Sequence, residues 1–172
     1  MRSAQKSVSI RFKMAIAYIG LGSNLNLPAR QVGAALARLA RTPQVKLLAQ
    51  SKLYRSAPMG EPGQPDYVNA ACMVETALPP PELMQALLAV ERDAGRVRDG
   101  RKWGPRALDL DLLHYEGVAM NTPALTLPHA GIAQRNFVLV PLAEIAPALE
   151  IPGLGRVSEL AASAGRSGLE LL

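Results

Sequence analysis

Residues 107–115 read Ala-Leu-Asp-Leu-Asp-Leu-Leu-His-Tyr, and this alternation of Leu with Asp predicts a half-buried β-strand. Because side chains alternate between the two faces of a strand, the leucines at even positions would point into a core, while Asp109 and Asp111 share the other face. The Cα atoms of the two acidic residues would then lie about 6.5 to 7 Å apart. Carboxylates held at that spacing repel each other unless cations lie between them, and Mg²⁺ together with phosphate oxygens would meet this need.

The segments before this strand predict the fold class. Helical periodicity extends from Pro28 to Arg41 and from the triple proline at 79–81 to Gly95, a residue suited to a helix C-terminus. Residues 137–145 read as either a late helix or an irregular apolar segment. Other strand-like segments occupy residues 15–21, 45–55 and 67–76. The order strand, helix, strand, strand, helix, strand predicts an α+β ferredoxin-like two-layer sandwich, with two helices packed on a mostly antiparallel sheet.

Size and composition indicate a single domain over residues 14–172. A chain of 172 residues that is 49% hydrophobic can bury a core without disulfides or structural metals. The only cysteine, Cys72, lies in an apolar run, which favours a reducing, cytoplasmic location. No apolar stretch approaches the roughly 20 residues of a membrane span, so we expect no membrane partner. Residues 1–13 contain four basic residues and no acidic ones, and we expect a disordered extension there; we also expect a monomer.

A basic stretch directly precedes the acidic strand. The net charge of +5 favours an anionic partner only weakly, but five of the basic residues gather at Arg96, Arg98, Arg101, Lys102 and Arg106. An isolated Asp-x-Asp is most often an ordinary solvated strand. Arginine suits bidentate contact with phosphate, so an acidic pair behind an arginine-rich loop favours phosphoryl chemistry.

Three further positions suggest a planar ligand. Tyr67 and Asn69 share a strand face, where an aromatic ring and an amide suit a flat heterocycle. The residues are equally consistent with a Tyr67 that belongs to the core and an Asn69 that lies on the surface. Trp103 lies in the polar basic loop, which indicates stacking on a ligand. His129 alone is more typical of a structural histidine.

Several motifs in sequence order strengthen this interpretation: Tyr18-Ile19-Gly20-Leu21-Gly22-Ser23-Asn24-Leu25, Gln64-Pro65-Asp66-Tyr67-Val68-Asn69-Ala70, Trp103-Gly104-Pro105-Arg106, Leu108-Asp109-Leu110-Asp111, Pro128-His129 and Arg135-Asn136-Phe137. From about Ile16 to Pro147 the chain resembles the 6-hydroxymethyl-7,8-dihydropterin pyrophosphokinase family. The resemblance implies a ferredoxin-like fold and transfer of diphosphate from ATP to the pterin hydroxymethyl group in folate biosynthesis, with release of AMP.

The resemblance also implies roles for individual residues. Asp109 and Asp111 would hold two Mg²⁺ ions and, with Arg96 and Arg106, form the catalytic set. The residues implied for ATP are Glu91, Arg98, Trp103, His129 and Arg135. Those implied for the pterin are Ser56, Met59, Tyr67, Asn69, Trp103 and Phe137. The tail after Ala148 lies outside the resemblance, and the sequence assigns it no role.

Two alternatives can be weighed from the residues. An RNA-binding module on the same scaffold would use the basic loop for phosphates and sheet aromatics for bases. Aromatic residues make up only 4% of this chain, and two acidic residues on the sheet would repel a nucleic-acid backbone, so we expect no nucleic-acid partner. A different Mg²⁺-dependent nucleotidyl or phosphoryl transferase stays open on the residues alone.

Overall fold

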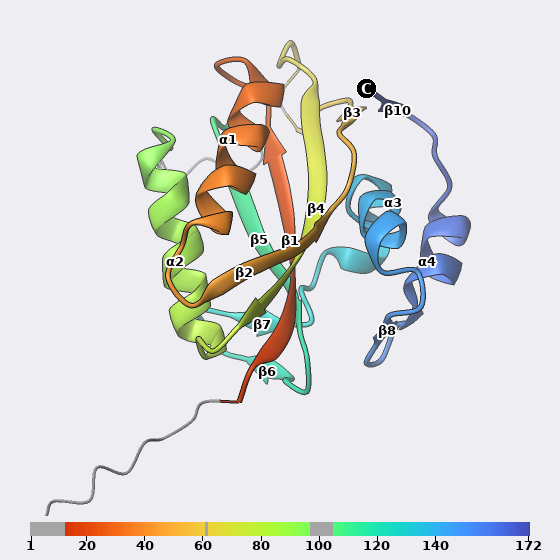
Figure 1. Ribbon diagram of the computed structural model, residues 1–172. Helices are drawn as coiled ribbons and strands as arrows, with labels where there is room; N and C mark the ends of the chain where they lie inside the picture. The colour runs from red at the N-terminus through yellow and green to blue at the C-terminus, as the bar shows by residue number, and fades with distance from the viewer. Residues whose placement is uncertain (1–12, 61, 97–104) are drawn as a thin grey trace, which may run out of the picture.

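The computed structural model describes residues 13–60, 62–96 and 105–172, and Figure 1 shows a sheet with helices on both of its faces. The extension expected over residues 1–13 therefore lies, apart from Lys13, outside the described residues. Inside the sheet, β1 (Ala15–Ser23) lies between β4 (Tyr67–Thr76) and β5 (Asp109–Tyr115). Both pairings are antiparallel, as the sequence predicted.

The outer part of the sheet corrects one prediction. The strand expected over 45–55 is two strands, β2 (Val45–Gln50) and β3 (Tyr54–Ser56), which both pair with β4. The break follows from a side-chain contact, because the Oγ of Ser51 accepts the backbone N–H of Ala71 at 2.9 Å, and this bond replaces a ladder bond between two backbones. The edge beyond β3 is β10 (Leu169–Leu171), so the order is β10-β3-β4-β1-β5, with β2 also paired to β4.

Helices α1 (Pro28–Ala40) and α2 (Pro80–Asp93) pack against one face of the sheet and lie together on the left in Figure 1. Each begins at a proline, whose missing N–H costs nothing in the first turn. Gly95 follows α2 with φ 86°, a conformation that favours glycine. These bounds confirm the two predicted helices and the α+β ferredoxin-like class.

The opposite face is covered by α3 (Asn136–Ile145) and α4 (Val157–Ala164), which lie on the right in Figure 1. The segment left open between helix and irregular structure is therefore a helix. The tail after Ala148, which had no predicted role, forms α4, β10 and a hairpin of β8 (Glu150–Ile151) and β9 (Gly155–Arg156). The remaining elements are β6 (Met120–Asn121), β7 (Thr126–Leu127) and the 3-10 helix η1 (Ile132–Gln134).

Alternation along β5 divides its side chains between the two faces of the sheet. Leu110 and Leu112, each 1% exposed, belong to the core beneath α1 and α2. Leu113 packs in a second cluster with residues of α3. Asp109 and Asp111 lie on the α3 side, toward the end of the sheet that α3 leaves open, as the period-2 pattern predicted.

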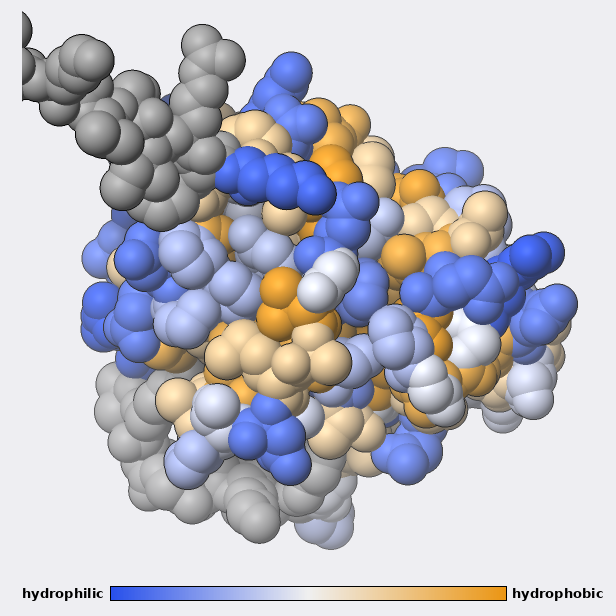
Figure 2. Space-filling view, turned by 90° about the horizontal axis from the view of Figure 1, so that it is seen from below, coloured by the Kyte–Doolittle hydropathy of each residue, from blue (hydrophilic) through white to orange (hydrophobic). Residues whose placement is uncertain are grey.

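The surface seen from below is mixed in polarity (Figure 2). Figure 2 shows the molecule from below, with hydrophilic and hydrophobic residues interspersed across that end. Within the described ranges, every helix is too short or too polar to cross a bilayer.

Candidate active site

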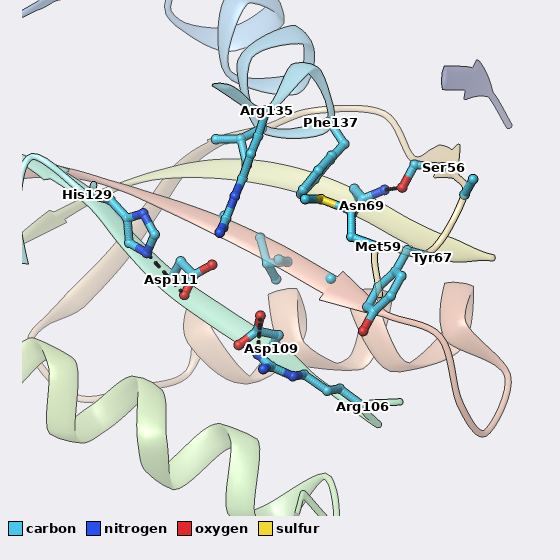
Figure 3. A pocket seen from close by; sticks show the side chains of 15 residues that line it. Ser56, Met59, Tyr67, Asn69, Arg106, Asp109, Asp111, His129, Arg135 and Phe137 are labelled. Atoms are coloured by element: carbon cyan, nitrogen blue, oxygen red, sulfur yellow. Dashed lines mark hydrogen bonds and ion pairs between the residues drawn. The ribbon is translucent and has the colours of Figure 1, made fainter. Parts of the chain in front are cut away.

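A cavity of about 390 Å³ opens on the α3 side of the sheet, over β1, β4 and β5. Figure 3 shows the side chains that line it, with Arg135 and Phe137 reaching in from α3 and its N-terminal side, the acidic residues on β5, and an aromatic and amide group on the far side. Ten residues predicted from the sequence meet here: Ser56, Met59, Tyr67, Asn69, Arg106, Asp109, Asp111, His129, Arg135 and Phe137.

Two glycines of the central strand form the floor of the cavity. In the ladder, Gly20 is opposite Asp111, and Gly22 lies between Asp109 on one side and Asn69 on the other. A Cβ built on Gly22 would lie 3.5 Å from Oδ1 of Asn69, which is ordinary contact, so the fold itself has room for it. The missing side chains leave a groove in which a ligand can lie directly on the backbone.

Asp109 is held by two arginines. Its Oδ1 accepts a hydrogen bond from Nη1 of Arg96 at 2.6 Å, and its Oδ2 accepts one from Nη1 of Arg106 at 3.0 Å. The same Arg96 nitrogen lies 2.7 Å from Oε1 of Glu91, whose side chain is 2% exposed. Glu91, predicted as a nucleotide contact, therefore lies beneath the site and holds Arg96 against the acidic strand.

Asp111 has a different environment. Its Oδ1 lies 3.7 Å from Nε2 of His129. Burial and the neighbouring charge of Asp109 raise the pKa of Asp111 to about 7. Nδ1 of His129 accepts the backbone N–H of Gly131 at 3.0 Å, and burial lowers the pKa of His129, so the neutral ring carries its proton on the Nε2 that faces Asp111. The acidic pair therefore combines one carboxylate neutralised by arginines with one whose charge is disfavoured.

The far side of the cavity is built from β3, β4 and the start of α3. Nδ2 of Asn69 donates to Oγ of Ser56 at 2.8 Å, which leaves Oδ1 of Asn69 over the glycine floor. Tyr67 shares this strand face, and burial raises its pKa above the ordinary value. The ring of Phe137 lies 6.0 Å from the guanidinium carbon of Arg135. An aromatic wall with an amide acceptor suits a flat, nitrogen-rich ring.

Ser23 and Asn24 organise the site, although the sequence placed them in a motif without assigning them a role. Oγ of Ser23 donates to the carbonyl of Ala107 at 2.6 Å. Oδ1 of Asn24 accepts the N–H of Arg106 at 2.8 Å, while its Nδ2 donates to Gln64 at 3.1 Å. Both side chains are fully buried, so the end of β1 holds the arginine segment and the loop before β4 in place.

Gly131 lies against the side chain of Arg135, a contact that the sequence did not predict. A Cβ on Gly131 would lie 2.7 Å from the guanidinium carbon of Arg135, so the guanidinium would have to move from its present position. The absence of a side chain at Gly131 therefore lets the guanidinium pack against the backbone beside the cavity.

A second cavity of about 290 Å³ adjoins the first and shares Asp111 and His129 with it. Its other walls are mostly apolar or hydroxyl-bearing: Met84, Leu112, Thr122, Pro123, Ala124, Leu125, Thr126 and Ala130. The two cavities meet at Asp111 and His129, so a long ligand could extend from one into the other.

Two predicted residues, Arg98 and Trp103, lie outside the described residues. Of the described candidates, Arg96 contacts Asp109, and the others line the first cavity or, for Glu91, support Arg96. The described part of the chain offers no group of three or more His, Cys, Asp or Glu side chains that could hold a metal ion by themselves. Two carboxylates on one face fit Mg²⁺ if phosphate oxygens and water complete its coordination.

Comparisons with known proteins agree with this geometry. The family described as 7,8-dihydro-6-hydroxymethylpterin-pyrophosphokinase (HPPK) matches residues 18–147. A 2-amino-4-hydroxy-6-hydroxymethyldihydropteridine pyrophosphokinase of Methylorubrum extorquens is 45% identical over 157 residues, which are 91% of this chain and 98% of that one. The folic acid synthesis protein fol1 of Schizosaccharomyces pombe is 37% identical over 140 residues, or 81% of this chain and 19% of that longer protein.

A solved structure shares the fold. The crystal structure of Plasmodium falciparum HPPK-DHPS wild type with pteroate superposes with a TM-score of 0.71 at 13% identity. The match covers 91% of this chain and 43% of that one, so this chain spans less than half of the solved protein.

Proposed function

Because the chain belongs to the 7,8-dihydro-6-hydroxymethylpterin-pyrophosphokinase family, we propose that the 390 Å³ cavity is where it transfers diphosphate from ATP to 6-hydroxymethyl-7,8-dihydropterin. This reaction of folate biosynthesis releases AMP and the dihydropterin diphosphate. One observation carries the assignment of the site: the acidic pair of β5 and the wall of Tyr67, Asn69 and Phe137 face each other across a floor of glycines.

The pterin takes the side of the cavity bounded by β3, β4 and Phe137. Oδ1 of Asn69 is placed to accept a hydrogen bond from a ring N–H, since Nδ2 of Asn69 is already bonded to Ser56. Tyr67, Met59 and Phe137 supply the apolar surface that a planar ring requires. The hydroxymethyl group then points toward Asp109 and Asp111.

ATP takes the junction of the two cavities. Its adenosine fits the second cavity, between Leu112 and Leu125, and its phosphates lie over Asp111 and His129. Arg106 and Arg135 line the first cavity near the same point, where their charges offset those of the phosphates. Arg96 adds charge from beneath, and Arg98 and Trp103 remain predicted ATP contacts, with Trp103 also predicted to cover the pterin.

The pterin hydroxyl attacks the β-phosphorus of ATP and gives up its proton to water, while the bond to the AMP oxygen breaks. The protein supplies position and charge, because such a transfer needs little covalent chemistry from side chains. Asp109 and Asp111 would hold Mg²⁺, two ions by the resemblance, and bound Mg²⁺ would neutralise phosphate charge and polarise the phosphoryl oxygens. Nε2–H of His129 donates to a phosphate oxygen, and Arg106 balances charge on the leaving AMP.

The direct test is to incubate the purified protein with MgATP and the hydroxymethyl-dihydropterin and to quantify AMP by chromatography. We expect AMP and the pterin diphosphate in equal amounts, no AMP without the pterin, and loss of turnover in EDTA that returns with excess Mg²⁺. ADP as the product would contradict diphosphate transfer. Full activity in EDTA would contradict only the metal assignment.

Residues 14–172 form the pyrophosphokinase domain in this proposal, since the C-terminal elements pack on the same sheet as the rest. We further propose a monomer in the cytoplasm, where the buried thiol of Cys72 stays reduced. Sedimentation velocity at micromolar concentration checks the monomer.

A further inference from the structure

The last eight residues, 165–172, lie beyond the part of the chain that the family matches, yet they pair with β3, whose Ser56 lines the cavity. We call this segment the C-terminal strap. It leaves α4 at Gly165, with φ 72°, and turns again at Gly168, with φ 73°. It then forms β10 beside β3, at the top of Figure 1, far along the sheet from the N-terminal end of β1.

The strap is bonded to β3. Leu169 is opposite Ser56 and Glu170 is opposite Arg55 in an antiparallel ladder. The N–H of Leu172 donates to the carbonyl of Leu53 at 3.0 Å, and the side chains of Arg55 and Glu170 form an exposed ion pair at 3.3 Å. Ser56 is the residue whose Oγ accepts the amide of Asn69.

The strap is also bonded to the start of α3. Nδ2 of Asn136 donates to the carbonyl of Ser167 at 3.0 Å, and the next residue is Phe137. One short segment therefore contacts both the strand that carries Ser56 and the helix turn that carries Phe137. These two residues line the same side of the cavity.

Strand β3 needs such support. It has only three residues, and residues 51–53 before it and 57–60 after it are not part of any strand or helix. Without β10 it would be a three-residue edge strand bonded to β4 alone, and short edge elements open readily.

We propose that the C-terminal strap positions the pterin wall, by holding Ser56 and Phe137 in register with Asn69. The inference rests on the proposed location of the pterin. It predicts a selective effect, because the acidic pair is on β5, at the opposite edge of the sheet from β10. Loosening the strap should weaken pterin binding and leave ATP binding unchanged.

The backbone of β10 offers a matched pair of variants. In an antiparallel ladder the bonded residues alternate, and Leu172 donates to β3, so the N–H of Glu170 also points toward β3 while that of Leu171 points away. Glu170→Pro therefore removes a ladder bond, whereas Leu171→Pro places the same ring where an edge strand tolerates it. Glu170→Ala removes the ion pair and keeps the N–H.

For Glu170→Pro we expect the KM for the pterin to rise about tenfold, the factor that corresponds to about 1.4 kcal/mol for one lost hydrogen bond. The KM for ATP should stay within about twofold, and Leu171→Pro and Glu170→Ala should stay within about twofold for both substrates. Amide hydrogen exchange of residues 54–56 should quicken in Glu170→Pro alone.

The inference is overturned if Glu170→Pro leaves the pterin KM near the wild-type value, or raises both KM values alike. Phe137→Ala tests the proposed pterin location separately from the proposed role of the strap. If Phe137→Ala raises the pterin KM and Glu170→Pro does not, only the strap inference is wrong. If neither variant changes it, the pterin location is wrong, and the strap inference falls with it.

Discussion

Asp109 and Asp111 are two residues apart on one strand, and the structure predicts that neutralising them has opposite effects on stability. Asp109→Asn removes the acid that Arg96 and Arg106 contact, and Arg96 has a side chain only 9% exposed. Asp111→Asn removes a carboxylate whose charged form is disfavoured in the folded protein, because burial and the charge of Asp109 raise its pKa. Both variants should lose turnover by at least about 10²-fold, since both acids face the phosphates.

The sign of the Asp111 effect follows from proton linkage. The unfolded chain releases the Asp111 proton near pH 3.8, while the folded protein keeps it until about pH 7. Stability therefore falls as pH rises between these values and the loss is complete above about pH 7. The full difference corresponds to about 4 kcal/mol, and partial exposure and salt screening reduce the expected gain for Asp111→Asn to about 1–2 kcal/mol.

The assay is thermal unfolding at pH 8 and pH 5 in EDTA, so that metal binding does not contribute. At pH 8 we expect Tm to rise by about 3–6 °C in Asp111→Asn and to fall by about 3 °C or more in Asp109→Asn. At pH 5 the gain for Asp111→Asn should fall to roughly two-fifths of its pH 8 value, because the unfolded chain, with a pKa of 3.8, has already released the proton that the folded protein keeps. A lower Tm for Asp111→Asn at pH 8, or an equal gain at both pH values, would refute this account of the acidic pair.

Two further predictions concern the groove floor and the phosphate site. Gly22→Ala should leave Tm within about 2 °C, because a Cβ there meets only ordinary contacts, yet it should raise the pterin KM about tenfold by filling the groove. The control is Gly33→Ala, in α1 with open space around it, which should stabilise the protein by about 0.5–1 kcal/mol with unchanged kinetics. An unchanged pterin KM in Gly22→Ala would place the pterin away from the floor. Arg106→Ala should lower kcat by about 10² to 10³ with the pterin KM kept, as measured by steady-state AMP release. Normal kcat with a lower Tm would instead mean that Arg106 only stabilises Asp109.

The local sequence pattern was sufficient to predict the main helices and strands. The period-2 alternation of 107–115 predicted both that β5 exists and that its two acids share a face. The prolines at 28 and 79–81 predicted where α1 and α2 begin, and the glycine at 95 predicted where α2 ends. The prediction of a single strand over residues 45–55 was wrong because the hydroxyl of Ser51 replaces a backbone carbonyl of that segment and accepts the N–H of Ala71 on β4. This bond depends on the partner strand.

In the candidate site, too, the sequence identified the residues but did not identify their contacts. Sequence motifs named the residues that line the cavity, and a resemblance gave them roles. The partners of those residues come from distant parts of the chain: Ser23 with Ala107, Asn24 with Arg106, and Asn136 with Ser167. The support that Glu91 gives to Arg96 was also missed, since a charged helix residue looks exposed until a neighbouring strand covers it.

By itself, then, the sequence determined which residues alternate, where helices start and stop, and which chemistry the acids and arginines suggest. Those properties are local, because they depend on backbone geometry over a few residues. Only the tertiary structure decided that one acid is neutralised by arginines while its neighbour is not, that glycines open the groove, and that the tail supports β3. Each of these depends on which segments pack together, and the periodicity of a single strand or helix does not identify the segment that packs against it.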